Sequence, residues 1–289
     1  MDYIVHLLIL IGIYLILAQS FNLNFGLGGL FNLAHVATYA IGAYTTALLS
    51  TDLQVGVWQC LIASGLHASF LAFLIGAISL RLTQDYFAIG SLAFSSVVGA
   101  LLINWKSLTR GVLGIPGIPR PEIGTIDFYN IVNYFVFVAI ICLVSQVCLW
   151  ILFRSSYARS LRAQAEADFS AMTLNRNTRA IKSWSFLLSS FFAGISGSLF
   201  AFYLNYIDPS SFSLTEMIFV LTIVVIGRPG SFWGVIASTI FLVLLPEPLR
   251  FLEIPPSILG PMRQMLYALI LFAMVYINRA KLFPVQRTV

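Results

Sequence analysis

The side chains best suited to chemistry in this sequence are uncharged polar groups that interrupt its apolar runs. In the first 45 residues, Asn32, His35 and Tyr39 recur at i, i+3 and i+7, a spacing that predicts one face of a helix. Such groups are costly against lipid, so we expect them to face a bundle interior or a water-filled path. Hydrogen bonding between helices would explain each residue taken alone, whereas the whole set favours a path for a neutral or zwitterionic solute. The predicted path residues are Asn22, Asn32, His35, Tyr39, Ser91 and Ser95.

Other chemistries lack the residues they need. Glu216 is the one carboxylate well inside an apolar run, close to the outer end of that run. We find no GxSxG or HExxH motif, no paired carboxylates and no metal-ligand spacing, so we predict neither an enzyme nor a metal site. No Walker A motif is present either. Uphill transport by this chain would therefore need energy from another polypeptide.

Composition places the chain in a membrane. Of 289 residues, 59% are apolar and 9% charged, against about 25% charged in soluble domains. The net charge of +5 is better explained by membrane topology than by nucleic-acid binding. The sequence predicts an all-α polytopic bundle of about eight to ten spans, which forms one transmembrane domain over residues 1–289. We expect residues 3–18 to belong to the first span rather than to a cleaved signal peptide. The apolar runs cover about 3–23, 27–50, 57–80, 86–104, 131–153, 184–206, 214–227, 232–249 and 263–278.

The runs at 214–227 and 232–249 are short, and GRPG at 227–230 separates them. They could form two spans or a broken pair that is partly re-entrant.

Most of the basic residues lie on the inner side of the membrane if the N-terminus lies outside and the spans alternate. This topology places 105–130, rich in Gly and Pro, in an extracytoplasmic loop, and the C-terminus in the cytoplasm. Five basic residues then lie outside: Lys106, Arg110, Arg120, Arg250 and Arg263. Eleven lie inside: Arg81, Arg154, Arg159, Arg162, Arg176, Arg179, Lys182, Arg228, Arg279, Lys281 and Arg287.

The charged island at 154–183 holds six of the sixteen basic residues. Leu161, Ala165, Phe169 and Met172 fall at i, i+4, i+8 and i+11, which predicts an amphipathic helix of about four turns, with a cap at Ser155 or Ser156. The island could be a surface helix held near anionic lipid, a calmodulin-like target, or a docking helix for a cytoplasmic partner. Because the chain has no Walker A motif and would need energy from another polypeptide for uphill transport, we favour the docking helix.

Three stretches resemble a known family. NFGLGGLFNLAHVATYAIGAYTTALL (24–49), RLTQDYFAIGSLAFSSVVGALLINWKSLTRGVLGIPGIP (81–119) and the segment from 154 to 212 are similar to LivM-type permeases of branched-chain amino acid ABC importers. The resemblance implies a multi-pass subunit of the bacterial plasma membrane, in contact with lipid. It also implies a second related permease subunit, usually in a heterodimer, two cytoplasmic ATPases that bind ATP and Mg²⁺, and an extracytoplasmic solute-binding protein that would dock near 105–130 and 207–213.

The island matches the ATPase-contacting loop of that family. The resemblance therefore implies a coupling role for Arg159, Leu161, Arg162, Ala165, Phe169 and Met172.

One departure from the family concerns GRPGSFWG at 227–234, where members commonly read Gly-Gly-Leu-Gly before Ser-x-Trp-Gly. We treat Gly227, Arg228, Pro229 and Gly230 as a gating turn that Arg228 and Pro229 charge and stiffen. The alternatives are a permease for urea or short amides, and a facilitator channel that works without partners.

Overall fold

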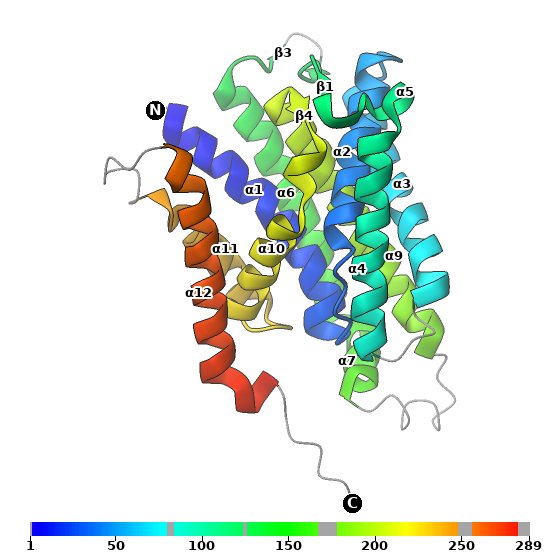
Figure 1. The fold of residues 1–289 in the computed structure, drawn as a ribbon, viewed down its shortest axis with the longest axis vertical. Coiled ribbons are helices and arrows are strands. Elements are labelled where there is room, and N and C mark those ends of the chain that lie inside the picture. Colours follow the sequence, from blue (N-terminus) through cyan, green and yellow to red (C-terminus); the bar gives the residue numbers. More distant parts are fainter. Residues whose placement is uncertain (1, 80–83, 124–125, 167–177, 248–255, 283–289) are drawn as a thin grey trace, which may run out of the picture.

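The computed structural model of the chain describes residues 2–79, 84–123, 126–166, 178–247 and 256–282 (Figure 1). The predicted all-α bundle is confirmed, with four very short strands besides the helices. The strands are β1 (Ile115–Pro116), β2 (Glu122–Ile123), β3 (Ile126–Asp127) and β4 (Tyr206–Ile207). The helices are α1 (Asp2–Asn22), α2 (His35–Thr51), α3 (Val57–Ser79), α4 (Gln84–Asn104), α5 (Lys106–Thr109), α6 (Ile131–Arg154), α7 (Ser156–Glu166), α9 (Thr178–Leu204), α10 (Leu214–Ile226), α11 (Phe232–Leu244) and α12 (Pro256–Leu282).

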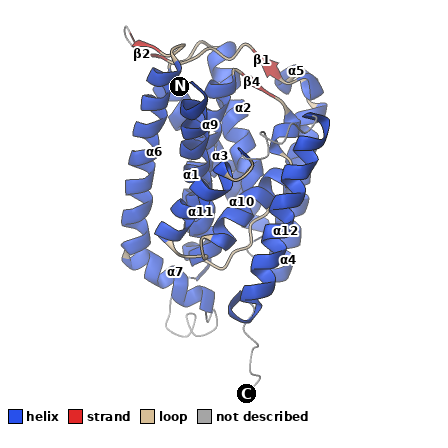
Figure 2. Cartoon of the chain, turned by 90° about the vertical axis from the view of Figure 1, so that its left-hand side faces the viewer, coloured by secondary structure: helices blue, strands red, loops and turns tan. Residues whose placement is uncertain are grey.

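The bundle has two distinct ends (Figures 1 and 2). The N-terminus and all four strands lie at one end, which we call the N-terminal end, and α7 and the last turn of α12 lie at the other. At the N-terminal end, β1 pairs antiparallel with β4, with Ile115 opposite Ile207. The pairing ties the loop at 105–130 to the segment at 205–213. Which end faces the cytoplasm stays a prediction.

Helix α1 runs through the middle of the bundle and packs against α6, α9, α10 and α11. Every residue from Ile16 to Asn22 is buried. The helix continues as a π-helical segment over Leu23–Leu27, which Gly28 closes. A π-helical turn at the end of a helix is unusual and often marks a functional site.

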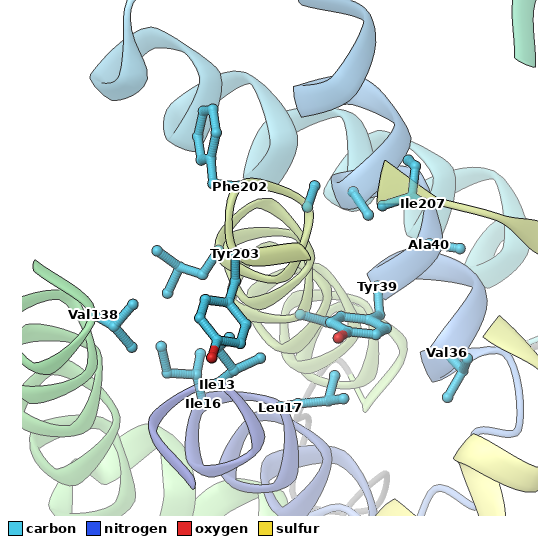
Figure 3. Packing of buried hydrophobic residues seen from close by; sticks show 14 of the residues in the cluster. Ile13, Ile16, Leu17, Val36, Tyr39, Ala40, Val138, Phe202, Tyr203 and Ile207 are labelled. Atoms are coloured by element: carbon cyan, nitrogen blue, oxygen red, sulfur yellow. The ribbon is translucent and has the colours of Figure 1, made fainter. Parts of the chain in front are cut away.

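Helices α2, α3 and α9 pack closely because small residues face one another. A methyl group on Gly42 would lie 2.4 Å from the Cα of Gly194, so the α2 and α9 backbones approach at a distance that excludes a side chain. Figure 3 shows part of the neighbouring core, in which Tyr203 of α9, Tyr39 of α2 and Ile13 of α1 belong to one apolar cluster.

One predicted span differs from the structure. The run at 27–50 does not form a helix along its whole length, because α2 begins only at His35. Asn32 therefore precedes the helix instead of sharing its face. Ser91 helps to hold the intervening segment, since its hydroxyl accepts a hydrogen bond from the Leu33 amide at 3.0 Å.

The runs at 214–227 and 232–249 form α10 and α11, two helices of 13 residues each. Each is about 20 Å long at 1.5 Å per residue, shorter than a bilayer core of about 30 Å. Six helices of the described part are long and apolar enough to cross a membrane: Asp2–Leu27, Val57–Gly76, Tyr86–Asn104, Ile131–Arg154, Thr178–Leu204 and Gly260–Ile277.

Candidate functional site

Helix α7 is the amphipathic helix predicted in the charged island. The Ser155 hydroxyl accepts a hydrogen bond from the Ala158 amide at 3.2 Å, so the predicted cap at this position is confirmed. Leu161 is fully buried and Ala165 half-buried, whereas Arg159 and Arg162 are exposed. Phe169 and Met172, also assigned to this helix, lie outside the described residues.

The buried face of α7 rests on the π-helical segment that ends α1. Leu161 and Ala158 form a small apolar cluster with Leu23 and Leu27 of that segment and with Phe153 of α6. Leu161 thus faces the rest of the chain, whereas Arg159 points to the surface where a partner could bind.

Tyr157 fastens α7 to the beginning of α9. Its hydroxyl donates a hydrogen bond to the carbonyl of Ile181 at 2.7 Å. Burial raises the pKa of Tyr157, so the phenol stays neutral and remains a donor at physiological pH. The helix is therefore held on two sides, by α1 and by α9.

The predicted gating turn touches both α7 and α1. The Arg162 guanidinium donates from Nη2 to the Gly230 carbonyl at 3.5 Å, and the Gly230 amide donates to Oδ1 of Asn22 at 2.8 Å. Asn22 also donates from Nδ2 to the carbonyl of Ser231 at 3.2 Å. A methyl group on Gly26 would lie 2.2 Å from the Gly230 amide nitrogen, so the turn and the end of α1 are in backbone contact.

The turn itself contains an unusual conformation. Arg228 is exposed and has a φ of 65°, in the left-handed region that non-glycine residues rarely adopt. Ser231 then caps α11 by accepting a hydrogen bond from the Gly234 amide at 3.1 Å. The structure thus brings together residues from three predicted groups: the coupling helix, the gating turn and the path residue Asn22.

The other path residues lie between helices. His35 is fully buried, and its Nε2 lies 3.0 Å from the Ser20 hydroxyl and 3.3 Å from the Leu17 carbonyl of α1. Tyr39 packs its ring against Phe200. Ser95 is partly exposed on α4.

Three path residues keep a buried polar atom with no hydrogen-bond partner among the described residues: Asn32 Nδ2, His35 Nδ1 and the Tyr39 hydroxyl. Such atoms are rare in folded proteins and call for an explanation. Each of these three atoms could form a hydrogen bond with a polar solute if the helices around it moved apart.

Two further buried amide side chains, Gln19 and Asn24, are not among the six predicted path residues. Gln19 donates to the carbonyl of Phe232 at 2.6 Å, beside Asn22. Asn24 donates to Ser189 and accepts from Ser185 of α9, both at 2.7 Å. The signal available in the sequence was the same as for Asn22, a polar side chain inside an apolar run.

The N-terminal end carries the loop predicted to receive a solute-binding protein. Arg120 donates from Nη1 to the Phe128 carbonyl at 3.0 Å and from Nε to Oδ1 of Asn205 at 3.3 Å. Asp208 accepts hydrogen bonds from Ser210 and Ser211. Partial burial opposes its ionisation, but these hydrogen bonds prevail and hold the pKa of Asp208 below its ordinary value. The loop is thus folded back and bonded onto 205–213.

Residues 3–276 match the family described as "Branched-chain amino acid transport system / permease component". The chain is 36% identical, over 261 residues, to the "High-affinity branched-chain amino acid transport system permease protein LivM" of Escherichia coli strain K12, an alignment that covers 82% of this chain and 61% of that protein.

The protein of the same name from Salmonella typhimurium strain LT2 is 35% identical over the same shares of the two chains. A "Probable branched-chain amino acid transport permease protein LivM" of Methanocaldococcus jannaschii is 25% identical, over 84% of this chain and 80% of its own length. The chain thus spans about three fifths of the first two relatives. No solved structure matches it.

Proposed function

Because the chain belongs to the family of branched-chain amino acid transport system permease components, we propose that it is a membrane-spanning subunit of an ATP-driven importer of branched-chain or other neutral amino acids. Its apolar helices make it a multi-pass membrane protein, which we place in the bacterial plasma membrane. The observation that carries the proposal is the continuous contact from the surface helix α7 to the end of α1 and to the turn at 227–231.

The energy comes from partner subunits in this proposal. Two cytoplasmic ATPases bind ATP and Mg²⁺, a second and related permease subunit completes the path in a heterodimer, and an extracytoplasmic solute-binding protein delivers the solute. The exposed basic face of α7, with Arg159 and Arg162, supports an ATPase contact. The bonded loop pair at the N-terminal end supports docking of a second protein there. This chain itself catalyses no reaction.

Movement of the ATPases is transmitted by α7. Because Leu161 rests on Leu23 and Leu27, a displaced α7 pushes the end of α1. Because Asn22 holds Gly230 and Ser231, α10 and α11 move with α1. This motion changes the packing around Asn32, His35 and Tyr39 and presents their unpaired polar atoms to the solute. The ATPases must bind the two conformations with different affinity for the cycle to run.

Two variants of α7 test separately whether the helix binds the ATPase and whether it transmits the ATPase motion to α1. Arg159→Glu reverses an exposed charge, so we expect loss of ATPase co-purification and of transport. Leu161→Ala removes buried contacts with the end of α1, so we expect retained co-purification and reduced amino acid uptake per ATP hydrolysed. Arg110→Glu, an exposed reversal at the N-terminal end, is the matched control and retains co-purification. Unchanged co-purification of Arg159→Glu would contradict the coupling role of α7.

A further inference from the structure

A charged pocket of about 360 Å³ opens at the N-terminal end, away from the coupling contacts. It lies where α1, α10 and α12 begin, and Figure 1 shows the start of α12 beside the start of α1. Tyr14, Glu216, Phe219, Arg263 and Tyr267 are among the residues that line it. None of the six predicted path residues does. Its volume is at the lower end of that of small-molecule sites, which are about 300–1,000 Å³.

Glu216 provides a negative wall. Its carboxylate accepts a hydrogen bond from the Tyr14 hydroxyl of α1 at 2.6 Å. Among the described residues, the structure records an ion pair only between Arg110 and Asp52, so Glu216 has no cationic partner there. A partly buried carboxylate without a cation is costly, and a ligand cation would neutralise it.

Arg263 provides a positive wall on the facing helix. Its Nε is buried and has no hydrogen-bond partner in the described part of the chain. Phe219 of α10 and Tyr267 of α12 bring the two walls together, since their ring centroids are 4.6 Å apart. Glu216 precedes Phe219 by three residues and Arg263 precedes Tyr267 by four, so each charge lies one turn before the ring contact, on the same face as the ring.

The remaining lining is mixed. Leu10, Phe219 and Val243 contribute apolar surface, and Tyr3, His6 and Glu247 are further titratable residues of the lining. His6 is hydrogen-bonded to Tyr203 of α9. The pocket therefore combines two carboxyl side chains, Glu216 and Glu247, with one guanidinium and an apolar surface.

We propose that this pocket binds the zwitterionic head of an α-amino acid, with the ammonium group on Glu216, the carboxylate on Arg263 and the apolar side chain against Leu10 and Phe219. A guanidinium is well shaped to bind a carboxylate through two hydrogen bonds. The inference rests on the proposed function, for which it supplies a solute site in the membrane subunit itself.

The test uses the purified full chain in lipid nanodiscs and radiolabelled L-leucine. Competitors are L-leucinamide, which keeps the ammonium group but lacks the carboxylate, and 4-methylpentanoate, which keeps the carboxylate but lacks the ammonium group. We expect Glu216→Gln and Arg263→Gln each to weaken leucine binding by about tenfold or more. Asp52→Asn and Arg110→Gln neutralise the exposed pair at the same end and serve as matched controls with unchanged binding.

The two competitors distinguish the loss of one charged contact from misfolding, because a misfolded variant would bind neither of them. We expect Glu216→Gln to bind 4-methylpentanoate as the wild type does, and Arg263→Gln to bind L-leucinamide as the wild type does. Arg263→Lys keeps the charge and retains most of the leucine affinity. Failure of the wild-type chain to bind leucine, wild-type leucine affinity in both Gln variants, or equal loss of all three ligands would each overturn the inference.

Uptake by the assembled transporter separates this inference from the proposed function. If the wild-type assembly imports leucine and both Gln variants import it with unchanged KM, the pocket is not the solute site, and the proposed function stands. If the wild-type assembly imports no branched-chain or other neutral amino acid, the proposed function itself fails.

Discussion

Replacement of Asn22 by Ala should uncouple the gating turn from α1. The side chain accepts from the Gly230 amide at 2.8 Å and donates to the Ser231 carbonyl at 3.2 Å. Its removal leaves both backbone groups without these partners at a largely buried contact. Each unsatisfied group costs about 1–3 kcal/mol, so the two together cost about 2–6 kcal/mol. A loss of about 1.4 kcal/mol in the active conformation already lowers a rate tenfold.

The assay is amino acid uptake per ATP hydrolysed in proteoliposomes that contain the complete transporter. We expect Asn22→Ala to lower this ratio at least about tenfold while the ATPases still co-purify, because the exposed face of α7 is unchanged. Asn104→Ala is the matched control, since Asn104 is exposed and its Nδ2 donates within its own helix, to the Ala100 carbonyl at 2.8 Å. Wild-type uptake per ATP in a folded Asn22→Ala variant would refute the proposed transmission through the turn.

Three further predictions concern packing, the turn and the N-terminal end. Gly194→Leu should lower the thermal stability of the purified protein by several degrees, whereas Gly99→Leu, where no atom lies within 4 Å of an added Cβ, should change it little. Arg228→Gly relieves a left-handed backbone and should raise the free energy of unfolding by about 1 kcal/mol, measured by chemical denaturation. Because its folded pKa is lowered, Asp208 stabilises the loop above its unfolded pKa of about 3.9 and loses that contribution in stronger acid. The protection of amides in 205–213 against hydrogen exchange, measured relative to their intrinsic exchange rates, should therefore fall below that pH, and Asp208→Asn should remove this dependence.

The long helices were predictable because a bilayer demands continuous apolar runs. The sequence placed α3, α4 and α6 within two residues of their observed ends and put the start of α9 six residues too late. It ended the first span at 23 and began the second at 27, whereas the helical segments break at 28–34. The prediction differed because residues such as Leu30 and Leu33 are as apolar as those of a span. Apolarity reports the surroundings of a segment and not whether its backbone is helical.

The sequence allowed candidate site residues to be chosen one by one, but it did not predict the contacts between them. Polar residues in apolar runs pointed to Asn22 and His35, yet nothing in the sequence links Asn22 to Gly230, which lies 208 positions away. The helical period likewise placed Leu161 on the apolar face of its helix but could not tell whether a partner or α1 covers it. Glu216 was noticed as a carboxylate in an apolar run, whereas Arg263 drew attention only through its charge, because its position opposite Glu216 depends on the packing of α10 on α12.

The most direct test of the account is a cross-link between α7 and an ATPase subunit. In a background that lacks the native cysteines, Arg159→Cys places a thiol on the exposed face of α7, and Leu113→Cys places one at an 82% exposed position of the N-terminal end. With a short bifunctional reagent, we predict that the complete transporter yields an ATPase adduct at position 159 and none at position 113, and that the yield at 159 changes when ATP is added. Absence of an ATPase adduct at 159, or an adduct of equal yield at 113, would contradict the assignment of α7 as the coupling helix.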